Sequence, residues 1–427
     1  MIKIAIVIGI IKFLLVISFL VLIHEGGHFL TAKAVGMQVN EFAIGFGPKI
    51  WSKKGKETTY SIRCLPLGGF VSLDGEEGKS DNPRAFANKS ILSRLAVVFM
   101  GPIVNIVFAL VAIFIIVLAQ GSYTTTTVKT IIPGYAGEKA GLLEGDKIIA
   151  LDGHKMHVKD DITEYLRTRK GAPLVVTALR NGEKIELSMV PTQEKGGYTG
   201  IVFVDDGENY YNEVKDVQVD SPAAEAELKP HDKIIGINGE DTIDAIYISE
   251  VAYENVDVPL SLKVDRDGEI LNLTLTPVCP EILVRYLIGF ESAETTSTLE
   301  LIYTAFWQSI AEMRSMLHQV WELLTGQISA KYLSGPVGIA KVVTNTNGWY
   351  DLFVLAVLIS MNLGIVNLLP IPPLDGGKIA FLCIEGVTKK PISEKVEYGF
   401  QIAGLAFFLA LTFFVTFNDI TRNLSIF

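Results

Sequence analysis

The apolar residues of this chain gather in four long runs, with segments of ordinary polarity between them. Each run is long enough to cross a hydrocarbon core of about 30 Å as an α-helix. The runs cover residues 4–23, 95–119, 352–370 and 399–417. A mean hydropathy of +0.37, with 49% hydrophobic residues, is high for a soluble globular protein. The pattern therefore predicts a membrane protein with four transmembrane helices.

The first run resembles a secretory leader in one respect, because Lys3 precedes an apolar stretch. No small-residue cleavage site follows it, and the run ends instead in the pentapeptide His-Glu-Gly-Gly-His at 24–28. Cleavage of a leader would remove these polar residues from the protein. We therefore expect a retained helix.

Charged residues are distributed unevenly between the predicted spans. Residues 31–94 carry ten Lys/Arg and six Asp/Glu, a net charge of +4, whereas residues 121–350 carry twenty and thirty-four, a net charge of −14. Short loops rich in Lys and Arg stay in the cytoplasm. The sequence thus predicts that 31–94 is cytoplasmic and that the acidic segment lies on the other side of the membrane. With four spans, both ends of the chain are expected on that outer side.

The acidic segment contains a repeat with an offset of 86 residues. Residues 134–153 align with 220–239, and each copy runs from a small-residue turn through a short helix to Asp-Lys-Ile-Ile and a glycine turn. Alternating strands follow, joined by Asn-Gly at 181–182 and by Asp-Gly at 267–268, which are strong hairpin signals. This pattern resembles two tandem PDZ domains of the bacterial type.

PDZ domains bind an extended peptide as an added strand at an open sheet edge. Two roles are therefore open for the repeated units. They capture C-terminal peptides, or they act as a spacer or size filter without peptide affinity. Further along the chain, apolar residues at helical spacing over 297–325 predict an amphipathic helix outside the membrane.

The pentapeptide at 24–28 fits the pattern His-Glu-x-x-His. In a helix, His24 and His28 lie on one face, near enough to bind one metal ion, with Glu25 beside them to act on a water molecule. Ionisable side chains at membrane depth cost several kcal/mol, so their presence favours a functional role. The alternative is that the histidines form hydrogen bonds between helices.

A hydrolytic zinc site uses three protein ligands and keeps one position open. The third ligand is expected in an acid surrounded by apolar sequence, and Asp375 meets that description. Prolines end the helix just before it, and two glycines after it allow a sharp turn. Broken backbone at membrane depth is tolerated where it lines a wet cavity. Histidine and carboxylate ligands in a hydrolase favour Zn²⁺ as the metal.

Over nearly its whole length the chain resembles the site-2 protease family (peptidase M50), in its regulator-of-sigma-E branch. The resemblance rests on HEGGH at 24–28, LDG at 374–376, Gly-Pro-x-x-Asn at 101–105 and the two PDZ-like units. It implies that His24, His28 and Asp375 bind Zn²⁺. It also implies that Glu25 acts as the general base and then as the acid.

The resemblance further implies residues that bind substrate. Asn362 and Asn367 are expected to bind an unwound substrate backbone, which suits amide groups that both donate and accept. Gly45 and Gly47 lie in segment 39–73, which the resemblance implies to be a re-entrant β hairpin that offers an edge to substrate. The alternatives are helix packing for the asparagines and an ordinary surface position for the hairpin.

These observations predict an α+β membrane protein with four transmembrane helices, a re-entrant β hairpin and two extramembrane PDZ-like domains. The predicted segments are a first transmembrane helix at 1–34, a cytoplasmic-side hairpin and surface helix at 35–90, a second transmembrane helix at 91–120, PDZ-like domains at 121–205 and 206–284, a periplasmic amphipathic helix and linker at 285–345, a third transmembrane segment at 346–378 and a fourth transmembrane helix at 396–420.

The predicted function is that of an intramembrane zinc metalloprotease acting on single-span membrane proteins in the lipid bilayer. The resemblance suggests a membrane-bound anti-sigma factor as substrate, with remnant signal peptides as a second candidate. A binding scaffold would need no buried acids, a zinc transporter would show polar residues along a path, and another metalloprotease family would use a different third ligand. A net charge of −10 opposes nucleic-acid binding, and three cysteines without CxxC give no disulfide framework or thiolate site.

Overall fold

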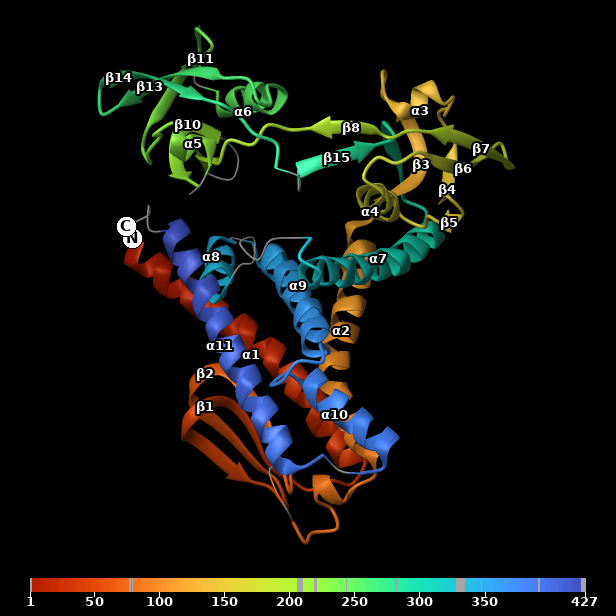
Figure 1. Ribbon diagram of the computed structural model, residues 1–427, viewed down its shortest axis with the longest axis vertical. Coiled ribbons are helices and arrows are strands. Elements are labelled where there is room, and N and C mark those ends of the chain that lie inside the picture. The colour runs from red at the N-terminus through yellow and green to blue at the C-terminus, as the bar shows by residue number, and fades with distance from the viewer. Residues whose placement is uncertain are drawn as a thin grey trace. The chain divides into compact units, whose positions relative to one another are not determined.

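The computed structural model describes residues 2–76, 78, 80–205, 210–218, 221–242, 244–280, 283–327, 335–346, 348–390 and 392–423. The chain folds as two units (Figure 1). A helical unit is built from residues up to Ser122 and from Ser297 to Thr416, and a strand-rich unit is built mainly from the insertion between them, Tyr123–Thr296.

Within the described residues, four helices are long and apolar enough to cross a membrane. They are α1 (Ile2–Ala34), α2 (Ile91–Gln120), α9 (Trp349–Asn367) and α11 (Glu394–Asn423), and their apolar stretches are Gly9–Ala34, Ile91–Gln120, Trp349–Asn367 and Lys395–Phe417. These helices confirm the four predicted spans. Because α1 continues to Ala34, past the predicted run at 4–23, His24 and His28 lie inside the helix.

Glycines allow the helices of this unit to approach closely. A Cβ added to Gly27 of α1 would lie 2.4 Å from the Met100 carbonyl oxygen of α2, and one added to Gly364 of α9 would lie 2.6 Å from the Ile106 side chain of α2. Small residues at such crossings let membrane helices pack backbone to backbone. Helix α2 thus has α1 and α9 packed tightly against it.

Three further helices belong to the helical unit. They are α7 (Thr298–Leu324), α8 (Pro336–Asn345) and α10 (Asp375–Thr388). Helix α7 occupies the segment predicted to be an amphipathic helix. The surface helix predicted before the second span is a single 3₁₀ turn, Phe86–Asn88, and α2 begins only after Ser90, whose hydroxyl accepts from the Ser93 N–H.

A long antiparallel hairpin follows α1, formed by β1 (Val39–Lys54) and β2 (Thr59–Leu73). Its register shifts repeatedly, and Gly45 and Gly47 in β1 have φ values of +85° and +83°, which favour glycine. The base of the hairpin packs against α1 and α2 through a buried cluster of Ala32, Met37, Val39, Leu73 and Val97. The end of β2 is therefore held beside the helix that carries the histidines.

The first sheet of the strand-rich unit has the strand order β16-β3-β4-β6-β7, with β5 paired to β4. Its strands are β3 (Tyr123–Ile131), β4 (Lys147–Leu151), β5 (His154–Lys155), β6 (Leu174–Arg180), β7 (Glu183–Met189) and β16 (Phe290–Thr295), and its helices are α3 (Ala136–Lys139) and α4 (Lys159–Arg169). Ile148, Leu151, Ile162 and Val176 belong to its buried core.

The second sheet has the order β14-β13-β11-β10-β9, with β12 paired to β11. Its strands are β9 (Ile201–Asp205), β10 (Tyr210–Val217), β11 (Lys233–Ile237), β12 (Glu240–Asp241), β13 (Leu260–Arg266) and β14 (Glu269–Leu275), and its helices are α5 (Pro222–Glu225) and α6 (Ala245–Glu254). A separate pair joins β8 (Thr192–Lys195) to β15 (Val284–Leu287).

The two sheets repeat the same local structure, as the 86-residue offset predicts. Asn181 and Gly182 turn the β6–β7 hairpin with φ values of +50° and +87°, and Asp267 and Gly268 turn the β13–β14 hairpin with +54° and +90°. Positive φ at both central residues is the turn geometry that these dipeptides favour. The repeat is therefore present in the structure as well as in the amino-acid sequence.

Strand pairing divides the insertion differently from the predicted boundaries at 205 and 285. Strand β9, before the first boundary, pairs with β10 of the second sheet, and β16, after the second boundary, pairs with β3 of the first. Segment 285–345, expected to hold a helix and a linker, thus also holds two strands. The six residues of β16 show no clean alternation of buried and exposed positions, which explains why the sequence pattern misses it.

Candidate metal centre

Helix α1 presents His24 and His28 on the face that packs against α2. The two residues are one helical turn apart, and their Nε2 atoms lie 3.3 Å from each other. His24 is 8% exposed. The predicted convergence of the two imidazoles on one point is therefore present.

Asp375 reaches the same point from the other end of the chain. It is the first residue of α10, and its Oδ2 lies 3.0 Å from His24 Nε2 and 3.4 Å from His28 Nε2. A Cβ added to the next residue, Gly376, would lie 2.0 Å from the Leu369 carbonyl oxygen. The turn that delivers the carboxylate thus requires the glycine that the sequence supplies.

These three side chains fit a zinc ion. Each offers one ligand atom, and the three atoms lie within 4.8 Å of one another. Two neutral imidazoles and one carboxylate form a common ligand set of hydrolytic zinc sites, where a fourth position stays open. The chemistry of the donors and their convergence therefore both suit Zn²⁺.

The ring of His28 is oriented by α2. Its Nδ1 lies 2.8 Å from the carbonyl oxygen of Val97, which can only accept a hydrogen bond. His28 Nδ1 therefore donates, and its Nε2 lone pair faces Asp375. A Cβ added to Gly101, one turn further along α2, would lie 2.2 Å from His28 Nε2, so the glycine leaves room for the ring.

Glu25 shares a cavity of about 500 Å³ with the three side chains. Residues 70–73 at the end of β2 form part of its wall, and Val97 and Val98 of α2 form another part. Glu76 and Lys378 complete the lining. The cavity thus brings a candidate general base, a candidate metal site and the end of a β-strand together.

The model of peptidase family M50 matches residues 12–411, which is most of the chain. The chain belongs to this family. The M50 peptidase is 32% identical over 443 residues to the regulator of sigma E protease of Haemophilus influenzae, covering 96% of this chain and 98% of that protein. It is 27% identical over 442 residues to regulator of sigma-E protease RseP of Salmonella typhimurium, with the same coverages.

A third relative, from Vibrio cholerae, is provisionally named a zinc metalloprotease and is 30% identical over 445 residues, covering 96% of this chain and 98% of that protein. The family and these relatives identify the chain as a zinc metalloprotease of the site-2 type. Its apolar helices make it a membrane protein. The candidate ligands His24, His28 and Asp375 suit that metal.

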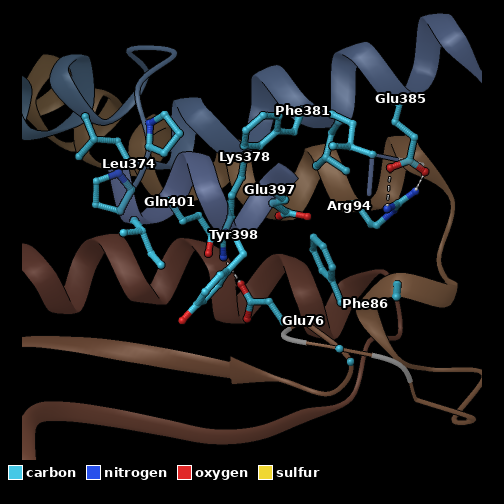
Figure 2. A pocket seen from close by; sticks show the side chains of 18 of the residues that line it. Glu76, Phe86, Arg94, Leu374, Lys378, Phe381, Glu385, Glu397, Tyr398 and Gln401 are labelled. Atoms are coloured by element: carbon cyan, nitrogen blue, oxygen red, sulfur yellow. Dashed lines mark hydrogen bonds and ion pairs between the residues drawn. The ribbon is translucent and has the colours of Figure 1, made fainter. Parts of the chain in front are cut away.

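The M50 peptidase has a second cavity of about 580 Å³, whose lining residues are drawn in Figure 2. Residues of α10, α11 and the start of α2 line it. Glu76 and Lys378 line both cavities, and Lys378 Nζ lies 2.5 Å from Glu76 Oε1. This ion pair therefore marks the boundary between the two cavities.

The four residues predicted to bind substrate lie outside the lining of the metal cavity. Asn362 is exposed, Asn367 is half-buried, and Gly45 and Gly47 sit in the irregular part of β1. Their role in substrate binding stays a prediction.

Segment 39–73, expected to offer a strand edge to substrate, lines the metal cavity with its last residues, 70–73. Sequence reasoning missed Glu76, Lys378 and the Val97 carbonyl. Lys378 follows Asp375 by three residues in a helix, so helical spacing was an available signal for it. The position of Glu76 depends on how the hairpin packs against the helices, and no pattern of neighbouring residues predicts that packing. Every residue has a carbonyl group, so the role of Val97 leaves no trace in the sequence.

Proposed function

We propose that this M50 peptidase hydrolyses peptide bonds in single-span membrane proteins, with His24, His28 and Asp375 as zinc ligands and Glu25 as general base. The observation that carries the proposal is the convergence of the three ligand atoms within 4.8 Å, in a unit whose helices are apolar enough to span a membrane. Ionisable groups are seldom kept in such helices without a function.

Each residue then has a chemical task. When bound, zinc supplies Lewis acidity, which polarises the scissile carbonyl and lowers the pKa of a water molecule. The carboxylate of Glu25 accepts a proton from the attacking water and returns it to the leaving amine. Because the proton returns to the product, Glu25 is regenerated and no covalent intermediate with the protein is needed.

The substrate must present an extended backbone, because the carbonyls of a helix are already hydrogen-bonded. The end of β2 lines the metal cavity and offers a strand edge for such a segment. Asn362 and Asn367 provide amide groups for an unwound backbone, and Gly45 and Gly47 give the hairpin its irregular course. In this proposal the hairpin re-enters the membrane beside the active site.

The names of two relatives point to a physiological substrate. Both are regulators of sigma E, which suggests that this chain also regulates a sigma factor by cleaving a membrane-bound anti-sigma factor in an envelope-stress response. Remnant signal peptides, which are single apolar segments, form a second substrate class.

The strand-rich unit is proposed to consist of two PDZ-like domains in the periplasm that select substrates by size or by their C-terminal peptide. The charge difference between the short and long loops supports this orientation in the bacterial inner membrane. With that orientation, the metal centre lies toward the cytoplasmic side, because His24 is beyond the midpoint of a helix that starts outside.

Zinc content tests the ligand set. We would purify the full chain in detergent as wild type, His24→Ala, His28→Ala and Asp375→Asn, with Asp351→Asn as matched control. Asp351 is an exposed acid in the first turn of α9, so its substitution changes the same charge in a helix without touching the site. We expect about one zinc per chain in wild type and control, and loss of zinc in the three ligand variants.

Full zinc content in Asp375→Asn would assign the third ligand elsewhere and contradict the proposed site. Equal zinc loss in Asp351→Asn would show that the loss reflects general instability. Cleavage of a single-span substrate, measured on the same samples, should follow zinc content.

A further inference from the structure

Each histidine of the metal centre needs a hydrogen-bond acceptor for its Nδ1–H, and the groups that face the two Nδ1 atoms differ. Both use Nε2 toward Asp375, at 3.0 Å for His24 and 3.4 Å for His28. A neutral imidazole that offers the Nε2 lone pair to a metal carries its proton on Nδ1, and that N–H needs an acceptor to fix the ring. For His28 the acceptor is the Val97 carbonyl oxygen, at 2.8 Å.

For His24 the group in that position is the side chain of Asn105. Its Nδ2 lies 3.4 Å from His24 Nδ1, across the interface between α1 and α2. Asn105 is fully buried, with 0% exposure, and its Oδ1 has no hydrogen-bond partner among the described residues. A donor therefore faces the nitrogen that must donate, while a buried acceptor on the same amide is unused.

A half-turn of the amide corrects the mismatch at His24. The two ends of a carboxamide have nearly the same shape, and their placement follows from the hydrogen bonds around them. With the amide turned, Oδ1 faces His24 Nδ1 and accepts a hydrogen bond from the Nδ1–H. The ring is then held with Nε2 toward Asp375, as the Val97 carbonyl holds the ring of His28.

We propose that Asn105 is a positioning residue that accepts the Nδ1–H of His24 and thereby fixes this ring for metal binding. The proposal rests on the proposed role of His24 as a zinc ligand. One helix, α2, then orients both histidines of α1, through a backbone carbonyl at one turn and a side-chain amide two turns later.

A packing role for Asn105 makes a different prediction. Ser360 of α9 donates its hydroxyl to the backbone oxygen of Asn105 at 3.2 Å, and this contact survives any substitution of the side chain at 105. Ser360 is itself fully buried, so Ser360→Ala perturbs the same helix contact without touching a histidine. It is therefore a matched control for loss of packing.

The test compares Asn105→Leu, Asn105→Asp and Ser360→Ala in the full chain. Zinc affinity is measured by competition with a chelator, the ligand field by the absorption of the Co²⁺-loaded protein, and stability by melting of the metal-free protein. Asn105→Leu should weaken zinc binding about 10- to 100-fold and shift the Co²⁺ spectrum. Asn105→Asp keeps an acceptor and should retain most of the affinity. Ser360→Ala should bind zinc like wild type.

Three results would overturn the proposal. Wild-type affinity in Asn105→Leu would show that the amide does not position His24. Equal losses in Asn105→Leu and Ser360→Ala would indicate packing alone. A loss in Asn105→Asp as large as that in Asn105→Leu would show that Asn105 donates rather than accepts.

A measurement on wild type covers the case in which the leucine variant does not fold. Nitrogen NMR of the zinc-loaded protein with ¹⁵N-histidine reports which ring nitrogen carries the proton, and the signals lost in His24→Ala identify His24. A protonated Nδ1 on His24 is expected, and an unprotonated Nδ1 would refute the proposal. If His24→Ala keeps its zinc, the ligand assignment fails instead, which separates the two failures.

Discussion

Arg94 at the start of α2 donates a hydrogen bond from each terminal nitrogen to Glu385 of α10 (Figure 2). The distances are 2.6 Å from Nη2 to Oε1 and 3.1 Å from Nη1 to Oε2. The two side chains are 13% and 18% exposed. The pair ties the helix that begins with Asp375 to the helix that orients His28. This ion pair therefore helps to hold together the proposed metal ligands, which come from distant parts of the chain.

Removal of one partner of this ion pair should weaken the contact between α2 and α10. We expect Glu385→Gln to lower the stability of the full chain by about 1–3 kcal/mol, because Arg94 keeps a half-buried charge without its carboxylate. Zinc affinity should fall with it. The double variant Arg94→Met with Glu385→Leu should be less destabilised than Glu385→Gln, and melting curves in detergent measure both. A double variant that is less stable than Glu385→Gln would contradict this explanation.

The two central glycines of the 24–28 pentapeptide should differ sharply when each is replaced by alanine. A Cβ on Gly27 meets the Met100 carbonyl oxygen at 2.4 Å, whereas a Cβ on Gly26 has nothing within 4 Å. Gly27→Ala should push α1 from α2 and reduce both stability and zinc binding. Gly26→Ala should be neutral or stabilise by up to about 1 kcal/mol, since alanine favours helix.

Both substitutions add one methyl group to adjacent positions of the same helix, so each serves as the control of the other. Melting temperature and zinc content of the two proteins decide the matter. Similar effects in both would show that close packing of α1 on α2 does not govern the site.

Several features of this site were predictable because each depends on a short stretch of sequence. The four spans follow from apolar runs, the histidine pair from helical spacing, and Asp375 from being an acid in apolar sequence. The partners of the site were harder to predict. Val97 acts through a carbonyl that every residue has, and Asn105 depends on how α2 faces His24 across a helix interface.

Long-range strand pairing was also beyond the sequence pattern. The repeat located both sheets, but β16 pairs with β3 across more than 150 residues of chain. Nothing in a six-residue segment specifies a partner so far away. A deletion that follows the predicted boundaries therefore separates strands that pair with each other.

That pairing defines a clean way to remove the strand-rich unit. Tyr123 and Thr295 are paired in adjacent strands, so the two ends of the unit lie side by side. We expect a chain in which a short Gly-Ser linker replaces residues 123–296 to retain zinc and to cut short substrates. If the unit selects substrates, this chain should also cut substrates with large periplasmic domains that wild type rejects.

Deletion of residues 121–284 is the matched comparison, because it leaves β15 and β16 without the strands they pair with. That variant should be less stable and more prone to aggregation. Unchanged rejection of large substrates after the clean excision would refute the selection role.

The Arg180–Asp146 pair predicts a pH dependence within the first sheet. Arg180 donates to Asp146 through Nε at 2.8 Å and Nη2 at 2.7 Å, and these hydrogen bonds hold the pKa of the Asp146 carboxyl below its usual value. A lowered folded-state pKa gives stability above the unfolded value of about 3.9, and this stability is lost as the pH falls through the folded pKa.

Arg180→Met should therefore speed hydrogen exchange of β4 at pH 7, by an amount that corresponds to about 1–3 kcal/mol. Compared at equal pH, the difference from wild type should shrink as the pH falls below about 4, because Asp146 of the unfolded chain becomes protonated there, and should be lost once the pH has fallen through the lowered folded-state pKa. Lys184→Met, at an exposed cation on β7, is the control and should change little. A difference that is the same at pH 7 and pH 3 would show that charge pairing is not its cause.

The most direct test of the central claim is a paired measurement on Glu25→Gln: zinc content and cleavage of a single-span substrate in detergent, beside wild type. The glutamine keeps the shape of the side chain but cannot accept a proton. We expect about one zinc per chain in both proteins and a loss of cleavage of at least about 10²-fold in the variant. Cleavage at the wild-type rate by zinc-loaded Glu25→Gln would contradict the account.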